Sequence, residues 1–228
     1  MRLTGAQIII HLLERQEITI IAGIPGGANL PLYDALSQSH TIRHVLARHE
    51  QGAGFIAQGM ARASGIPAVC FATSGPGATN LLTAIADARL DSIPLICITG
   101  QVPCAMIGTD AFQEVDTYGM SIPVTKHNFL VRSAEELLKV IPEAFRIAAS
   151  GRPGPVLIDV PKDVQNQVVE FHAWPAPGRP DPGPAFAQTD VVYAAELINT
   201  AARPILYIGG GVIQAGAAQC IVRSRPLI

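Results

Sequence analysis

The sequence has little charge and few aromatic side chains, and both shortages limit what it can bind. Charged residues make up 15% and aromatic residues 5% of the 228 residues, and the formal net charge is -2. No basic run or aromatic-interleaved basic patch occurs, so nucleic acid is not an expected partner. No segment is apolar over the ~20 residues that cross a bilayer, and the first residues have no signal-peptide pattern. We therefore expect a cytoplasmic protein that does not bind membranes.

Cysteine and histidine are also scarce, which argues against a metal centre. The four cysteines have no metal-ligand spacing, and no pair of the six histidines stands at helical spacing beside a carboxylate. Cys70 and Cys97 lie inside apolar runs and are expected to be reduced thiols of the core. The sequence thus predicts no metal bound by this chain alone.

Aliphatic residues, in contrast, are abundant. Hydrophobic residues make up 49% of the chain, which indicates a compact α/β protein. Because the surface must then be poor in charge, we expect part of it to be buried against other subunits or a further part of the polypeptide.

Short apolar strands alternate with helices along the first 160 residues. Thr4-Gly5-Ala6-Gln7 has the form of a capping box, so a first helix is expected to begin there. Further helices are expected at residues 50–63, 78–89 and 133–150, and strands at 19–22, 42–46, 68–73, 95–99, 124–131 and 156–160. Strands that are apolar throughout and alternate with helices predict an α/β fold, a parallel sheet with helices on both faces.

Residues 101–121 have no clean period, and a long stretch of this kind in a compact domain is typical of a functional loop. We expect substrate contacts there.

Proline divides the chain into two domains. Residues 1–168 are expected to form the α/β domain, and 169–188 a proline-rich, extended, exposed linker, because such segments cannot join a strand ladder. Residues 189–228 are predicted to begin a second α/β domain, with a helix at 189–201, a strand at 204–208 and a turn at the triple glycine. About 40 residues cannot bury a core of their own, so this second domain is expected to be truncated.

Two motifs carry the chemistry. Glu50 begins a Gly/Ala-rich helix in Arg48-His49-Glu50-Gln51, and one βα unit later comes the glycine-rich turn Ser74-Gly75-Pro76-Gly77-Ala78-Thr79-Asn80. With the runs at 23–28, 91–95, 99–103, 110–114, 126–127, 151–156 and 159–163, the sequence resembles the thiamin diphosphate-dependent carboligases, most closely the large catalytic subunit of acetolactate synthase (acetohydroxyacid synthase). So many ordered runs are more specific than any one motif.

The resemblance implies a role for Glu50 and a reaction. Its carboxylate would hydrogen-bond to N1′ of the cofactor pyrimidine, so that the 4′ nitrogen can remove the thiazolium C2 proton. The implied activity is decarboxylation of pyruvate on thiamin diphosphate and ligation of the hydroxyethyl unit to a second 2-oxo acid, a step of branched-chain amino acid biosynthesis. The alternative for Glu50 is a carboxylate that only stabilises a helix macrodipole.

The same resemblance assigns the remaining site residues. Gly26, Gly27 and Ala28 would approach the thiazolium and substrate, and Pro76 and Asn80 would line the pyrimidine pocket. In a homodimer with the site at the subunit interface, Phe112, Gln113 and Lys162 would contact the substrate, Gln113 as a hydrogen-bond donor and Lys162 as the partner of its carboxylate. The alternatives are a plain βα turn at the glycines, core packing for Phe112 and a solvated surface ammonium for Lys162.

Two further cofactors are implied. Arg152 resembles an arginine that contacts a structural FAD, and Gly209, Gly210 and Gly211 fall where the flavin-binding domain of the family begins. The Gly-Asp-Gly ligands of the family for Mg²⁺ and the diphosphate do not occur in this sequence and would lie in a further domain. This chain alone is therefore expected to be inactive, and a small regulatory subunit is a further partner of such enzymes.

Three alternatives stay open. Glyoxylate carboligase, benzaldehyde lyase and pyruvate oxidase are rivals within the same superfamily. A pyrimidine-binding or dimerising fragment without catalysis is a second class. A nucleotide-binding regulatory domain built on Gly75 and Gly77 is a third, and it predicts heat on titration with NAD or ATP.

Overall fold

A computed structural model describes residues 1–223, which form two compact units that divide after Asp181. The first unit, Met1–Asp181, contains a sheet of six parallel strands in the order β3-β2-β4-β5-β7-β6. The strands are β2 (Ile20–Gly23), β3 (Arg43–Leu46), β4 (Ala68–Ala72), β5 (Leu95–Gln101), β6 (His127–Leu130) and β7 (Val156–Pro161). The predicted α/β fold with a parallel sheet is confirmed.

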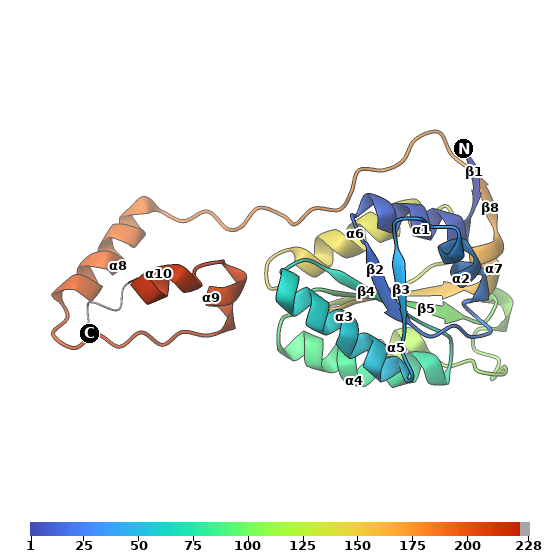
Figure 1. Ribbon diagram of the computed structural model, residues 1–228, viewed down its shortest axis with the longest axis horizontal. Helices are drawn as coiled ribbons and strands as arrows, with labels where there is room; N and C mark the ends of the chain where they lie inside the picture. The colour runs from blue at the N-terminus through green and yellow to red at the C-terminus, as the bar shows by residue number, and fades with distance from the viewer. Residues whose placement is uncertain (224–228) are drawn as a thin grey trace. The chain divides into compact units, whose positions relative to one another are not determined.

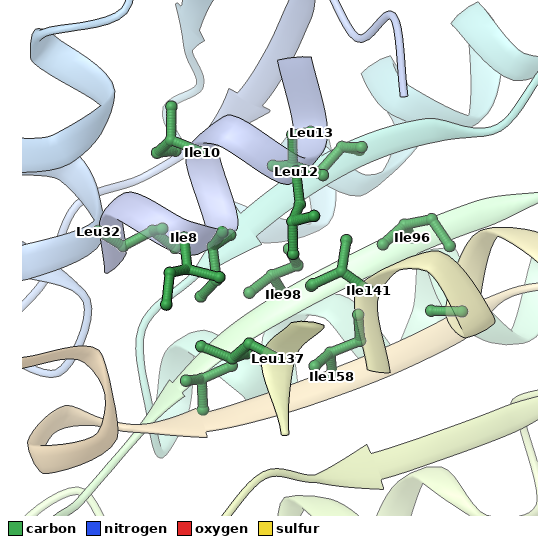
Figure 2. Packing of buried hydrophobic residues seen from close by; sticks show 14 of the residues in the cluster. Ile8, Ile10, Leu12, Leu13, Leu32, Ile96, Ile98, Leu137, Ile141 and Ile158 are labelled. Carbon is green, nitrogen blue, oxygen red and sulfur yellow. The ribbon is translucent and has the colours of Figure 1, made fainter. Parts of the chain in front are cut away.

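Helices cover both faces of this sheet, as predicted (Figure 1). One face is covered by α1 (Gly5–Arg15), α2 (Leu30–Ser37) and α6 (Leu137–Ala149), and the other by α3 (Glu50–Ser64) and α4 (Pro76–Leu90). Figure 2 shows aliphatic side chains of α1 and α6 meeting those of β5 and β7, among them Ile96, Ile98 and Ile158. Every residue of β4, β5 and β7 is buried, because both faces of these strands are covered.

The helix signals of the sequence are realised in the backbone. Thr4 accepts a hydrogen bond from the Gln7 amide (3.2 Å), and the Gln7 side chain accepts one from the Thr4 amide (2.9 Å), which completes the predicted capping box. Helix α4 begins at Pro76, two residues earlier than expected, because proline suits the first turn of a helix.

Small residues bring α3 and α4 close together. A Cβ added at Gly54 would lie only 2.6 Å from the Cβ of Ala84, so glycine permits this approach. Buried alanines 53, 57 and 61 continue the contact along α3. Since Glu50 begins α3 and Asn80 lies in the second turn of α4, this packing places the two side chains near each other.

The first unit also contains two short strands and a short helix that were not predicted from the sequence. Strand β1 (Arg2–Thr4) pairs antiparallel with β8 (Val168–Glu170), and α7 (Lys162–Asn166) follows β7 directly. Phe171 is buried, and its ring packs edge-on against Trp174, with 4.8 Å between the centroids. The first residues of the predicted linker therefore belong to the first unit, because their apolar side chains pack against its core.

The long stretch after β5 contains little regular structure, in keeping with the predicted loop. Only the short η1 (Cys104–Met106) and α5 (Thr117–Ser121) interrupt it.

The second unit contains α8 (Gln188–Thr200), α9 (Gly210–Gln214) and α10 (Ala218–Arg223). The strand predicted at 204–208 is wrong: these residues form none, because a strand needs a neighbour to pair with and the described part of this unit offers no other strand. Residues 224–228 of the predicted second domain lie outside the described residues. Nowhere in residues 1–223 is a helix both long and apolar enough to cross a bilayer.

Candidate active site at the carboxyl edge of the sheet

Five loops meet at the edge of the sheet where the parallel strands end. This edge is the usual place for a ligand in such folds. The loops follow β2, β3, β4, β5 and β7. Together with the first two turns of the helices that follow them, they carry most of the residues that were assigned to a site: Gly26, Gly27, Ala28, Glu50, Pro76, Asn80, Phe112, Gln113 and Lys162.

Glu50 is half-buried at the start of α3, where the His49 ring caps the helix by accepting a hydrogen bond from the Gln51 amide (3.2 Å). Glu50 Oε2 accepts a hydrogen bond from Asn80 Nδ2 at 2.9 Å. Glu50 Oε1 has no hydrogen-bond partner within the described chain, and it lies 3.5 Å from the position that a Cβ on Gly77 would take. Oε2 is thus fixed by Asn80, and Oε1 is left without a partner.

The turn between β4 and α4 needs glycine at two positions. Gly75 has a φ of 53°, and a Cβ there would lie 2.6 Å from the carbonyl oxygen of Gln113. A Cβ at Gly77 would lie 2.7 Å from Cγ2 of Thr73. The turn therefore packs closely against the Gln113 backbone and the Thr73 side chain, and a side chain at Gly77 would reach Glu50 Oε1.

Gln113 itself has a left-handed backbone, with a φ of 57°. Such a conformation in a residue with a Cβ costs on the order of 1 kcal/mol, and residues of this kind are enriched at functional sites. The same loop carries Phe112, whose side chain is 87% exposed. Core packing within this chain, the alternative role considered for Phe112, is thereby excluded.

The glycine loop after β2 is held by buried polar side chains. Asn29 Oδ1 accepts a hydrogen bond from the Gly26 amide (2.7 Å), and Thr73 Oγ1 accepts one from the Ala28 amide (3.2 Å). Gln165 Nε2, on α7, donates to the Ala28 carbonyl (2.8 Å).

Sequence reasoning missed these three anchors. Thr73 lies in the same run as Ser74-Gly75, but nothing in the sequence marks Asn29 or Gln165, because their partners are backbone atoms of distant segments.

Lys162 begins α7, directly after β7, and is half-buried. Its ammonium forms no hydrogen bond or ion pair with the rest of residues 1–223. A cation at this edge is therefore available to a ligand.

A second acid lies beneath the loop that follows β5. Asp159 of β7 is 1% exposed, and its two carboxylate oxygens accept hydrogen bonds from Thr99 Oγ1 (2.6 Å) and Gln101 Nε2 (3.0 Å). Burial raises the pKa of Asp159 to about 7, although both hydrogen bonds act in the opposite direction. Asp159 is not among the site residues that were predicted from the sequence.

Arg152 does not join the other predicted residues. It precedes β7, and so lies at the opposite, amino edge of the sheet, where its guanidinium donates to Ser92 Oγ (2.6 Å) and to the Leu90 carbonyl (3.0 Å). Gly209, Gly210 and Gly211 lie in the second unit, and a Cβ on any of them would meet no atom within 4 Å. The contacts of these four residues therefore give no support to the predicted flavin site.

The described residues, 1–223, bring no three His, Cys, Asp or Glu side chains together in a way that could hold a metal ion. The prediction that this chain alone binds no metal stays a prediction.

Comparison with known proteins shows the family to which the chain belongs. The family model "Thiamine pyrophosphate enzyme, N-terminal TPP binding domain" matches residues 3–120, and the chain belongs to this family.

Its similarity to acetolactate synthase large subunits extends over nearly the whole chain. The chain is 69% identical over 216 residues to acetolactate synthase isozyme 1 large subunit of Escherichia coli K12, a match that covers 95% of this chain and 38% of that protein. It is 55% identical over 223 residues to acetolactate synthase of Mycobacterium bovis (96% and 36%), and 49% identical over 226 residues to the isozyme 2 large subunit of E. coli K12 (99% and 40%). The chain thus spans less than half the length of these curated relatives.

Proposed function

We propose that this chain supplies the pyrimidine-binding half of an acetolactate synthase-type active site. The reaction would be decarboxylation of pyruvate and ligation of the resulting two-carbon unit to a second 2-oxo acid, as in branched-chain amino acid biosynthesis. The observation that supports it best is the geometry of Glu50. One carboxylate oxygen is held by Asn80, and the other has no hydrogen-bond partner among residues 1–223.

The residues at this edge fit an aminopyrimidine ring. Such a ring needs a hydrogen-bond partner for its nitrogen, and Glu50 Oε1, which has no partner among residues 1–223, can offer one. The hydrogen bond from Asn80 fixes the orientation of the carboxylate before a ligand arrives, which reduces the cost of binding.

When bound, thiamin diphosphate supplies the carbon nucleophile that decarboxylation and ligation require. The task of Glu50 is to hold a proton between its Oε1 and the pyrimidine nitrogen. Gln113, fixed in its unusual backbone against Gly75, offers a side-chain amide donor for an oxygen that gains negative charge. The unpaired ammonium of Lys162 is suited to the carboxylate of a 2-oxo acid, and exposed Phe112 to its apolar part.

Other parts of the site are expected from elsewhere. The ligands of the diphosphate and of Mg²⁺ would come from a further domain, and Phe112, Gln113 and Lys162 would complete the site across a homodimer interface. A structural FAD contacted by Arg152 and the triple glycine, a small regulatory subunit and a cytoplasmic location all stay predictions.

Exchange of the C2 proton of thiamin diphosphate for deuterium, followed by proton NMR with Mg²⁺ present, tests the role of Glu50. In a complete homologue, which also carries the diphosphate and Mg²⁺ ligands, we expect the wild type to accelerate this exchange and Glu50→Gln to abolish the acceleration. Glu170→Gln, which changes an exposed glutamate of β8, is the matched control and should behave as wild type. Equal acceleration by wild type and Glu50→Gln would contradict the proposal.

A second candidate function is a pyrimidine-binding or dimerising module that catalyses nothing by itself. The absence of Gly-Asp-Gly from the sequence favours it for this chain alone. Acetolactate formation from pyruvate, with thiamin diphosphate, Mg²⁺ and FAD added, separates the two candidates. Turnover that Glu50→Gln abolishes would exclude the non-catalytic module.

A further inference from the structure

The loop that carries Phe112 and Gln113 rests on buried polar groups. Gln101, the last residue of β5, donates from Nε2 both to the Asp159 carboxylate (3.0 Å) and to the Val115 carbonyl (3.0 Å). Its Oε1 accepts a hydrogen bond from the Val102 amide (2.9 Å). The Gln101 side chain thus bridges the first and last residues of segment 102–115.

The orientation of Gln101 is fixed by its partners. A Gln side chain can be turned end for end, but the Val115 carbonyl can only accept and the Val102 amide can only donate, so the NH₂ group faces Val115 and Asp159. Thr99, the register partner of Asp159 on β5, holds the other carboxylate oxygen at 2.6 Å. Both Asp159 and Gln101 are almost fully buried, at 1% and 2% exposure, so water does not compete for these bonds.

The loop has few other contacts to set its shape. Asp163 accepts from the Cys104 amide near its start, and Gly75 packs against the Gln113 backbone. Phe112, near the tip, is exposed. Without the bridge through Gln101, the segment that presents Gln113 to the carboxyl edge would keep the bond of Cys104 to Asp163 and the packing of Gly75 on Gln113.

We propose that Asp159 is a positioning residue that orders the loop of Phe112 and Gln113 through the Gln101 amide. A catalytic benefit of this order rests on the proposed function, in which Phe112 and Gln113 contact the substrate. The order itself is a property of the chain without ligand.

Two substitutions separate this role from ordinary core packing. Asp159→Asn keeps both contacts, because its carbonyl can accept from Gln101 and its NH₂ can donate to the Thr99 hydroxyl. Asp159→Leu keeps the approximate size of the side chain but removes one of the two acceptors of the Gln101 NH₂ group, so that one buried N–H is left without a partner. If Asp159 only filled the core, leucine would be neutral or stabilising, as is common when buried charged groups are replaced by apolar ones.

Amide hydrogen–deuterium exchange of the full chain without cofactor measures the order directly. We expect residues 103–116 to exchange about tenfold faster in Asp159→Leu and within about threefold of wild type in Asp159→Asn, while the peptide of α1 stays unchanged in both. If Asp159→Leu does not fold, Gln101→Met must give the same local acceleration.

Three results would overturn the proposal. They are unchanged exchange of the loop in Asp159→Leu, equal acceleration in Asp159→Leu and Asp159→Asn, and acceleration spread evenly over the loop and α1. The measurement needs neither thiamin diphosphate nor pyruvate. A failure of the proposed function, read from Glu50→Gln, therefore leaves this outcome unaffected.

Discussion

Replacing Asp159 with asparagine is expected to stabilise the protein at pH 8 and to leave its stability near pH 4 almost unchanged. Burial raises the pKa of the Asp159 carboxyl from an ordinary value of 3.8 to about 7 in the folded protein. The folded chain therefore holds a proton there at pH values at which the unfolded chain has released it. Asparagine makes similar hydrogen bonds and has no proton to release.

The sign and size of the effect follow from proton linkage. Between pH 4 and 7 the folded state binds more protons at this site than the unfolded state, so the wild-type free energy of unfolding falls as the pH rises. Each pH unit corresponds to about 1.4 kcal/mol, and the two pKa values differ by about three units. The wild-type protein therefore loses at most about 4 kcal/mol of unfolding free energy through this group, and it loses the full amount only above pH 7. The Asp159→Asn variant would not suffer this loss.

Urea unfolding at several pH values between 4 and 8 measures this difference. The fluorescence of Trp174, the single tryptophan, reports on the first unit, because its ring packs against Phe171 and His11. Comparing the variant with wild type at each pH removes the contribution of all other titrating groups. Asp34→Asn, at an exposed position of α2, is the control and should change stability little at either pH. A difference between Asp159→Asn and wild type that is constant with pH, or a variant less stable at pH 8, would refute the reasoning.

Two further predictions concern packing and thiol chemistry. Gly26→Ala places a methyl group 2.6 Å from the Thr73 side chain, so it should lower the free energy of unfolding in urea by about 1–3 kcal/mol. Gly27→Ala places its methyl group in open space and should lower the free energy of unfolding by less than about 1 kcal/mol. Equal effects of the two variants would show that the loop is not packed as described. In the native protein a thiol reagent should modify exposed Cys220 well before Cys70 and Cys97, as read by mass spectrometry. The thiols of Cys70 and Cys97 are fully buried and 3.4 Å apart, and the contact with Cys70, together with burial, raises the pKa of the Cys97 thiol. Early labelling of this buried pair would contradict the described pairing of β4 with β5.

Much of the first unit could be predicted from the sequence, because its signals are local. The capping box of Thr4 and Gln7, the apolar runs of the strands and the glycines around Pro76 each depend on neighbouring residues. The resemblance to the thiamin diphosphate-dependent carboligases assigned Glu50 and Asn80 to one site before their contact was known.

The remainder depends on contacts between distant segments. Nothing near Gln165 in the sequence indicates that its amide binds the Ala28 carbonyl, and nothing near Gln113 indicates that its backbone rests on Gly75. Asp159 did carry a signal, since an acid inside an apolar strand is seldom buried without partners.

The contrary case is the strand expected at residues 204–208. Its apolar run was real, but the described part of the second unit gives it no neighbouring strand.

The most direct test of the central claim is to follow the amide signals of Gly77 and the side-chain NH₂ of Asn80 by NMR as thiamin diphosphate is added. If Glu50 binds the pyrimidine ring, these signals should shift in the wild-type chain, and Glu50→Gln should weaken the response at least about tenfold, as expected for loss of a hydrogen bond to a charged group. Shifts confined to other parts of the chain, or an undiminished response in Glu50→Gln, would contradict the assignment of this carboxylate to the cofactor.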